Sequence, residues 1–176
     1  MRIISGRYRK KIINPPSNFH ARPTTDIAKE ALFNILVNTM DIEKVEALDL
    51  FSGSGSIAYE LASRGCKEVW AIELNYNHFA FIKKTAEELK FDQMKVIKAD
   101  VFKFLEQCHR KFDLIFADPP YELEKQVEIP SLVFKNELLT QDGVLILEHS
   151  EETDYSEEER FIETRKYGKV HFSFFK

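Results

Sequence analysis

Apolar runs and amphipathic segments alternate along the chain from residue 45 to residue 148. The runs have the length and composition of buried strands and occupy residues 45–50, 68–73, 94–99, 112–117 and 144–148. The segments between them have the pattern of helices and occupy residues 56–64, 77–90, 101–108 and part of 124–139. Strands that alternate with helices form a parallel sheet through right-handed crossovers. The sequence therefore predicts an α/β fold, with a turn at Asp142-Gly143 before the fifth strand.

The first 25 residues are basic, although the chain as a whole has a net charge of −4. Short strands at residues 2–5 and 11–13 would form a small hairpin there. The segment holds six basic side chains and no acid: Arg2, Arg7, Arg9, Lys10, Lys11 and Arg22. The rest of the chain then carries a net charge of −10. A basic arm on an acidic body indicates a polyanionic partner, and a solvated terminal segment is the alternative.

A helix and a second hairpin are expected outside the alternating region. The helix should begin near Asp26, with an apolar face made of Ile27, Ala31, Leu32, Ile35 and Leu36. Residues 161–166 and 169–175 flank Tyr167-Gly168, which predicts an antiparallel hairpin. Segment 151–159 has six acids and no base, so we expect an exposed loop.

The length of 176 residues fits one domain, with a basic arm at 1–25 and a core at 26–176. No apolar run approaches the roughly 20 residues of a membrane span, and no signal peptide is visible. Cys66 and Cys108 are far apart, and the five histidines lack metal-ligand spacing. We therefore expect a cytoplasmic protein with free thiols, no metal and no membrane contact, and a monomer by default.

The fourth predicted strand ends in Asp118-Pro119-Pro120-Tyr121. Proline cannot continue a sheet ladder, and the carboxyl end of a parallel strand faces the ligand crevice. A carboxylate oxygen of Asp118 and the carbonyl of Pro119 could accept the two N–H bonds of an exocyclic amine. Tyr121 could stack on the base that carries the amine, which contributes about 1–3 kcal/mol. The alternative is a Pro-Pro turn preceded by an acid by chance.

A glycine-rich turn with Gly53 and Gly55 follows the first strand, and Glu73 ends the next strand. Glycines let a ligand approach the backbone, and the acid can hold the hydroxyls of a ribose. This pattern fits a dinucleotide or S-adenosylmethionine. Asp49, placed to hold an ammonium group, and the 118–121 motif favour S-adenosylmethionine. A structural turn with a surface Glu73 is the third possibility.

The two motifs together resemble the class I, Rossmann-like methyltransferases that modify exocyclic amines. The opening 2–6 (Arg-Ile-Ile-Ser-Gly), the segment 22–26 (Arg-Pro-Thr-Thr-Asp) and the run 30–34 narrow the resemblance to RsmD-type 16S rRNA guanine-N2 methyltransferases. The resemblance covers residues 2 to about 148. It implies a mostly parallel seven-stranded sheet with a reversed last strand, helices on both faces and a small basic N-terminal hairpin extension. It also implies a guanine of 16S rRNA in the small ribosomal subunit or its assembly intermediate as substrate.

The resemblance also assigns roles to residues. The S-adenosylmethionine site would comprise Asp49, Phe51, Ser52, Gly53, Gly55, Glu73, Leu74, Asp100 and Val101. The target base would be held by Asp118, Pro119, Pro120 and Tyr121, and the RNA by Arg2, Arg7, Arg9, Lys10, Lys11, Arg22 and Thr24. Asn75 stands where an acid is common, and Ile57-Ala58 where Leu-Gly is common. The acidic loop 151–159 has no match.

The expected reaction is a direct in-line methyl transfer that depends mainly on alignment of the reactants, an effect that can supply about 7–11 kcal/mol. A DNA adenine-N6 or cytosine-N4 methyltransferase has the same two motifs but usually needs an added target-recognition region. A non-catalytic RNA-binding or ribosome-assembly protein on the same fold is another alternative, and a nicotinamide-dependent reductase is the third.

Overall fold

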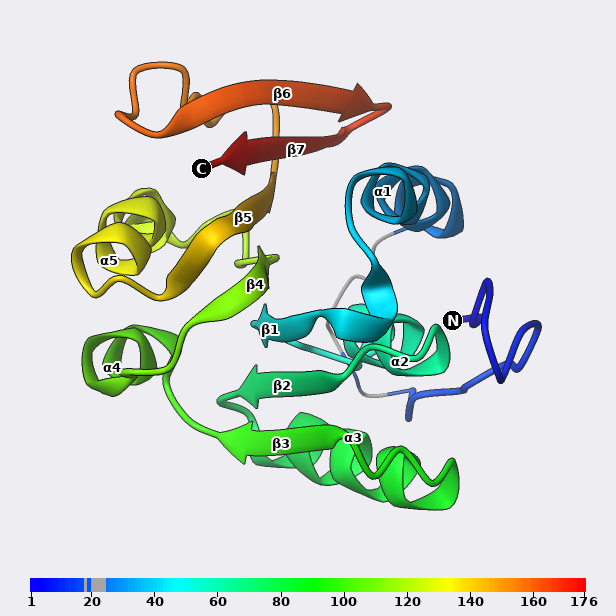
Figure 1. Ribbon diagram of the computed structural model, residues 1–176. Helices are drawn as coiled ribbons and strands as arrows, with labels where there is room; N and C mark the ends of the chain where they lie inside the picture. The colour runs from blue at the N-terminus through cyan, green and yellow to red at the C-terminus, as the bar shows by residue number, and fades with distance from the viewer. Residues whose placement is uncertain (18, 20–24) are drawn as a thin grey trace.

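The computed structural model describes residues 1–17, residue 19 and residues 25–176 (Figure 1). Its seven strands form one sheet in the order β3-β2-β1-β4-β5-β7-β6. The strands are β1 (Glu46–Leu50), β2 (Glu68–Glu73), β3 (Met94–Lys98), β4 (Phe112–Ala117), β5 (Leu139–His149), β6 (Phe161–Tyr167) and β7 (Val170–Phe175). The α-helices are α1 (Asp26–Thr39), α2 (Ser56–Ser63), α3 (Tyr76–Glu88), α4 (Val101–Gln107) and α5 (Ile129–Lys135), with short 3₁₀ turns at Ile42–Lys44 and Glu124–Glu128.

The strand directions confirm the predicted α/β sheet. Strands β3, β2, β1, β4 and β5 are parallel neighbours, whereas β7 runs antiparallel to both β5 and β6. The chain proceeds outward from β1 to β3, and then crosses back to β4 on the other side of β1. Ligands of open α/β sheets bind at the carboxyl ends of the strands where the order reverses in this way.

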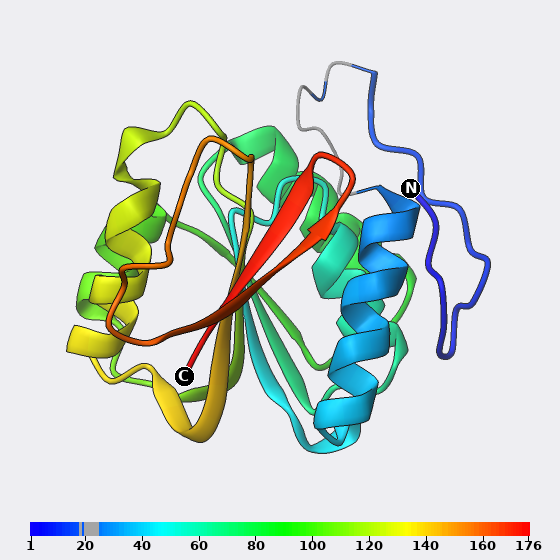
Figure 2. The same ribbon diagram turned by 90° about the horizontal axis from the view of Figure 1, so that it is seen from above.

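Helices cover both faces of the sheet (Figure 2). Helices α1, α2 and α3 pack on one face, and their buried residues share an apolar cluster with Ala47, Phe116, Ile146 and Phe172 of the strands. Helices α4 and α5 pack on the other face and share a second cluster with Leu48, Ile115, Leu145 and Phe175. Side chains alternate along a strand, so the face on which a strand's apolar residues are buried also determines the face toward which its terminal polar residues point.

The turn predicted at Asp142-Gly143 is wrong, because both residues lie inside β5. Strand β5 begins at Leu139, and its pairing with β4 shifts between Phe112–Leu139 and Leu114–Val144. Residues 140–143 of β5 therefore lie opposite the single residue Asp113 of β4, which makes three residues extra, as in an enlarged β-bulge. The polar Asp142-Gly143 pair marks this irregularity rather than a chain reversal.

Helix α1 begins where predicted but buries a different face. Leu32 and Leu36 are buried as expected, whereas Ile27 is 78% exposed and Lys29 is 1% exposed. The N-cap is Thr25, whose side chain accepts the N–H of Ala28. Lys29 can be buried because its ammonium donates to the carbonyl of Arg2 at 2.7 Å and to Ser56 Oγ at 3.0 Å. These hydrogen bonds to residues distant in sequence explain why the helix buries Lys29 and exposes Ile27, contrary to the apolar pattern.

The basic N-terminal segment is fixed to helix α2. The predicted hairpin is present: Arg2 and Ile12 form an antiparallel bridge, and the backbone N–H groups of Ile3 and Ile13 donate to the carbonyls of Lys11 and Met1. The buried carboxylate of Glu60 on α2 accepts the backbone N–H groups of Ile4 at 2.7 Å and Ser5 at 3.0 Å. Ser63 Oγ in turn donates to the carbonyl of Ser5. Residues 1–13, which we call the basic hairpin, therefore form part of the folded body.

Candidate active site

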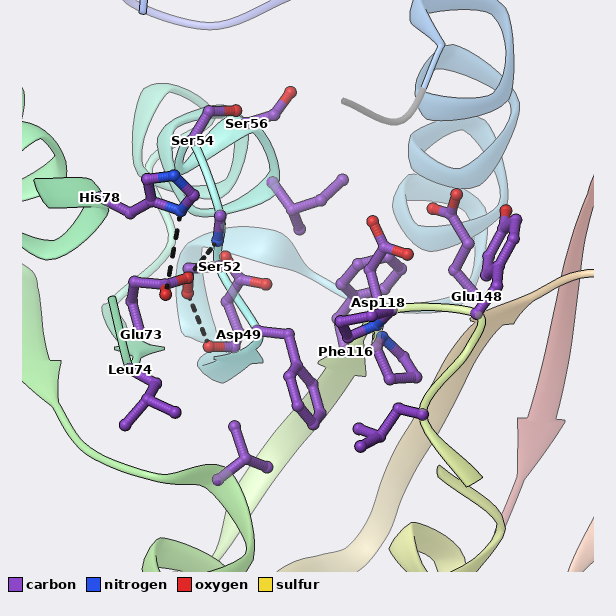
Figure 3. Close-up of a pocket in the computed structure, with 18 of the residues that line it drawn as sticks. Asp49, Ser52, Ser54, Ser56, Glu73, Leu74, His78, Phe116, Asp118 and Glu148 are labelled. Atoms are coloured by element: carbon purple, nitrogen blue, oxygen red, sulfur yellow. Dashed lines mark hydrogen bonds and ion pairs between the residues drawn. The ribbon is translucent and has the colours of Figure 1, made fainter. Parts of the chain in front are cut away.

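A cavity of about 780 Å³ lies at the carboxyl ends of β1, β2, β4 and β5 (Figure 3). Sites for small molecules usually measure about 300–1,000 Å³. The structure places all four predicted base-binding residues on its wall, together with eight of the nine predicted cofactor residues. Among the described residues, Gly55 is the cofactor residue that does not line it. Arg22 and Thr24 lie outside the described residues.

The loop between β1 and α2 bends sharply around the cavity. Phe51, Gly53 and Gly55 all have positive φ, of 59°, 54° and 83°. A Cβ on Gly55 would lie 2.7 Å from the ring of Tyr59, so a side chain there would collide with the first turn of α2. Gly55 therefore shapes the turn without lining the cavity, whereas Ser52 and Gly53 line it.

Glu73 connects the end of β2 to the glycine-rich loop. Its Oε2 accepts the N–H of Gly53 at 2.8 Å, and its Oε1 accepts the N–H of Asn75 at 2.7 Å. His78 Nδ1 lies 3.9 Å from Oε1 (Figure 3). A carboxylate has about four lone-pair positions, so Glu73 retains acceptors for the hydroxyls of a ligand. Asn75, which stands where the resemblance implies an acid, caps α3 by accepting the N–H groups of Asn77 and His78 with its side chain.

The wall beyond Glu73 combines an acid with apolar side chains. Asp100 caps α4 by accepting the N–H of Lys103 at 3.0 Å, and it lines the cavity with Val101 and Phe102. The rings of Phe51 and Phe102 meet edge to face with centroids 6.2 Å apart. An acceptor beside two aromatic rings suits the amino edge and the faces of a purine.

Carboxyl groups dominate the floor of the cavity. Asp49 is 2% exposed, and within the part of the chain that the structure describes its Oδ2 has no hydrogen-bond partner. Burial, and then the charge of Glu73, raise the pKa of Asp49 to about 7. Burial, and then the charges of Glu148 and Asp49, also raise the pKa of Asp118 well above its usual range. A cationic ligand would relieve this repulsion, so the cavity favours a positively charged molecule.

Sequence reasoning missed several lining residues. The structure adds Glu148 near the end of β5, Lys169 in the turn before β7, and Val170 at the start of β7. Glu148 could have been found, because it closes the fifth predicted strand as Asp118 follows the fourth. Residues at the start of β7 line the cavity because the antiparallel hairpin packs beside β5. No local sequence motif predicts this pairing. The other additions are Thr25, Ser54, Ser56, Ile57, Asn75, His78, Phe102, Phe116, Glu122 and Leu123.

The basic side chains predicted to hold RNA lie outside the cavity. Arg2, Arg7, Arg9, Lys10 and Lys11 are exposed on the basic hairpin, and none of these described residues lines the cavity. The hairpin nevertheless touches its rim, since Met1 Sδ lies 3.6 Å from Ser54 Oγ. Lys29 also joins the carbonyl of Arg2 to Ser56. The basic hairpin is thus in direct contact with residues that line the cavity.

Two kinds of feature are absent from the described residues. No group of three or more His, Cys, Asp or Glu side chains there is arranged to hold a metal ion. None of the helices in the described ranges is long and apolar enough to span a membrane.

Comparison with known proteins identifies the family. The family described as Conserved hypothetical protein 95 matches residues 1–176. The chain is 32% identical over 148 residues to the ribosomal RNA small subunit methyltransferase D of Buchnera aphidicola subsp. Baizongia pistaciae, covering 84% of this chain and 75% of that relative. It is also similar to the solved structure of Escherichia coli yhhF, with a TM-score of 0.86 and 27% identity over 99% of this chain and 96% of that chain.

A more distant structure shares the fold. It is the Thermus thermophilus 16S rRNA N2 G1207 methyltransferase RsmC in complex with AdoMet and guanosine, with a TM-score of 0.70 and 22% identity over 89% of this chain and 44% of that chain. Together with the acidic cavity at the switch point of the sheet, the family match shows that this chain belongs to the Conserved hypothetical protein 95 family of RsmD-type, Rossmann-like, S-adenosylmethionine-dependent methyltransferases.

Proposed function

We propose that this protein methylates the exocyclic N2 amine of one guanine in 16S rRNA of the small ribosomal subunit, with S-adenosylmethionine as the donor. The observation that carries the proposal is the position of Asp118-Pro119-Pro120-Tyr121, whose four residues line the acidic cavity beside the glycine-rich loop. The names of the relatives, which are rRNA methyltransferases, support the substrate class.

The residues on the cavity wall fit S-adenosylmethionine. When bound, this cofactor supplies a methyl group that is already activated on a sulfonium. The buried carboxylate of Asp49, with its unpartnered Oδ2 among the described residues, suits the ammonium of the methionine part. Glu73 retains acceptors for the ribose hydroxyls, and Leu74, Asp100 and Val101 lie where an adenine would be held. Phe51, Ser52, Gly53 and Gly55 shape the loop around the donor.

The target amine would be held by the end of β4. The carboxyl of Asp118 and the carbonyl of Pro119 accept its two N–H bonds and turn the nitrogen toward the methyl group. Asp118 also receives or passes on the proton that leaves after transfer. Tyr121 is 36% exposed, so its ring can stack on a base that enters from solvent. A base in a helix would first be swung out, at a cost of a few kcal/mol.

The basic hairpin is the proposed contact with the RNA. The exposed Arg2, Arg7, Arg9, Lys10 and Lys11, with Arg22 and Thr24, would contact phosphates near the target. We further propose that residues 1–176 act as a single methyltransferase domain, that the protein is a cytoplasmic monomer, and that the assembled or partly assembled small subunit supplies part of the specificity.

The test is transfer of labelled methyl from S-adenosylmethionine to three acceptors side by side: small subunits that lack the modification, naked 16S rRNA and duplex DNA. We expect label in the subunit, recovered as N2-methylguanine after digestion. Label in DNA alone would assign the protein to the DNA amino-methyltransferases. Bound S-adenosylmethionine without label in any acceptor would favour a binding protein on this fold.

A further inference from the structure

Asp118 and Glu148 lie at the same level of the sheet, at the carboxyl ends of the neighbouring strands β4 and β5. Ala117 of β4 pairs with Leu147 of β5 in parallel register, so the next residues along the two strands are Asp118 and Glu148. Phe116 and Ile146, two residues earlier, both belong to the core beneath α1, α2 and α3. Since side chains alternate, Asp118 and Glu148 project from that same face. Figure 3 shows their carboxyl groups pointing to the same side of the cavity.

Glu148 is a buried acid on the wall of the cavity. Glu148 is 3% exposed and lines the cavity. Its charge is the second cause, after burial, that raises the pKa of Asp118. Two adjacent carboxyls in one low-dielectric site repel each other when both are ionised. A pair of this kind is best accommodated by a ligand that offers two adjacent hydrogen-bond donors.

The amines that are methylated in nucleic acids differ in the ring nitrogen beside them. Guanine N2 stands next to N1–H, which is a donor. Adenine N6 stands next to N1, and cytosine N4 next to N3, and both of these ring nitrogens are acceptors. An ionised carboxylate only accepts hydrogen bonds, so it pairs with N1–H of guanine and repels the lone pair of the other two bases.

We propose that Glu148 is the residue that selects guanine, by accepting N1–H while Asp118 holds the neighbouring N2 amine. This inference rests on the proposed function and adds to it the residue that discriminates among bases. Burial makes the selection strong, because a site built around one hydrogen bond rejects analogues that leave its polar group unpaired.

The experiment replaces the acceptor guanine, located first by wild-type methylation, with 2,6-diaminopurine by splinted ligation of the rRNA. This base keeps the N2 amine but has an acceptor at N1. Substitution with 6-thioguanine, which keeps N1–H and alters position 6, is the matched substrate control. We expect wild-type kcat/KM to fall about 100-fold or more on diaminopurine and far less on thioguanine.

The protein variant is Glu148→Gln, whose amide can donate to N1 of diaminopurine. We expect the kcat/KM of this variant on guanine to fall about tenfold or more. We also expect its ratio of kcat/KM on guanine to kcat/KM on diaminopurine to be about tenfold smaller than in the wild type. Glu151→Gln, in the exposed loop that follows β5, is the matched control and should keep the wild-type ratio. A thermal unfolding curve establishes that each variant is folded.

The outcomes separate this inference from the proposed function. Equal wild-type rates on guanine and diaminopurine would overturn the inference without any variant. A proportional loss on both bases in Glu148→Gln would overturn it as well, since a purely structural role does not change the ratio. If the wild type methylates no guanine in any rRNA acceptor, the proposed function itself fails, and the inference fails with it.

Discussion

A Cβ placed on Gly6 would lie 1.9 Å from the carbonyl oxygen of Ser63. Gly6 also has a φ of +80°, which disfavours any residue with a side chain. The basic hairpin thus rests directly on the backbone of α2, and the contact depends on the absence of a side chain at residue 6.

Gly6→Ala should therefore detach the basic hairpin from α2. We expect rRNA methylation to fall at least about tenfold, because the phosphate contacts lose their fixed position. The affinity for S-adenosylmethionine should change little, since the cofactor wall is built from other elements. Limited trypsin digestion should show faster cleavage after Arg7 and Arg9.

Gly168→Ala is the matched control for that change. Gly168 also has a positive φ, of 65°, but nothing lies within 4 Å of a Cβ built there. Both variants carry the conformational cost of about 1–2 kcal/mol, and only Gly6→Ala adds the collision. Equal protease sensitivity and equal methylation in the two variants would contradict the docking argument.

Asp118→Ala should greatly reduce turnover and leave cofactor binding nearly intact. Loss of the group that orients the amine and handles its proton is expected to lower kcat by about 10²–10⁴-fold. Asp118→Asn keeps one acceptor oxygen and should lose less. Isothermal titration calorimetry measures the binding of S-adenosylmethionine, and a lost affinity in Asp118→Ala would show that this residue serves the cofactor rather than the base.

Asp49 should make the stability of the ligand-free protein depend on pH. Its pKa is about 7 in the folded state, above the usual value of 3.8, so the folded chain keeps a proton that the unfolded chain releases. Stability should then fall as pH rises from about 4 to 7, by roughly 4 kcal/mol in total. Asp49→Asn lacks this loss and should be the more stable protein at pH 8. Urea unfolding at pH 5 and pH 8 checks the difference.

The same residue predicts how the cofactor acts. A cationic ligand favours ionised Asp49, so the stabilisation that S-adenosylmethionine gives the wild type should grow between pH 5 and pH 8. The Asn variant should bind the cofactor weakly at both pH values. If the stabilisation by S-adenosylmethionine depends on pH in the same way in wild type and variant, the placement of the ammonium beside Asp49 is contradicted.

The basic hairpin should make RNA affinity depend on salt. Each phosphate contact contributes a log–log slope of about −0.7 to −0.9. Arg9→Gln should make the slope shallower by about one contact, whereas Lys135→Gln on α5, across the sheet, should leave it unchanged. Filter-binding titrations over a range of KCl concentrations measure the slopes, and a flat dependence in the wild type would exclude the hairpin as a phosphate-binding surface.

The sequence predicted the parts of the fold that local patterns determine. Strands β2 and β4 have the predicted bounds, and the acids at strand ends meet in one cavity because parallel strands finish at one edge. The burial of Lys29 was not predictable, since its partners come from residues 2 and 56. The position of Glu148 at the end of a predicted strand was readable from the sequence, but its place beside Asp118 depends on the pairing register of β4 and β5.

The docking of the basic hairpin has a consequence for protein synthesis. Ile4 is bonded to Glu60, 56 residues further along the chain, so the hairpin leaves the ribosome well before its partner helix exists. Contacts between residues so distant in sequence form late in folding, because the loop between them must first be closed. During translation the five basic side chains of the hairpin are therefore carried on a segment that has not yet docked onto α2.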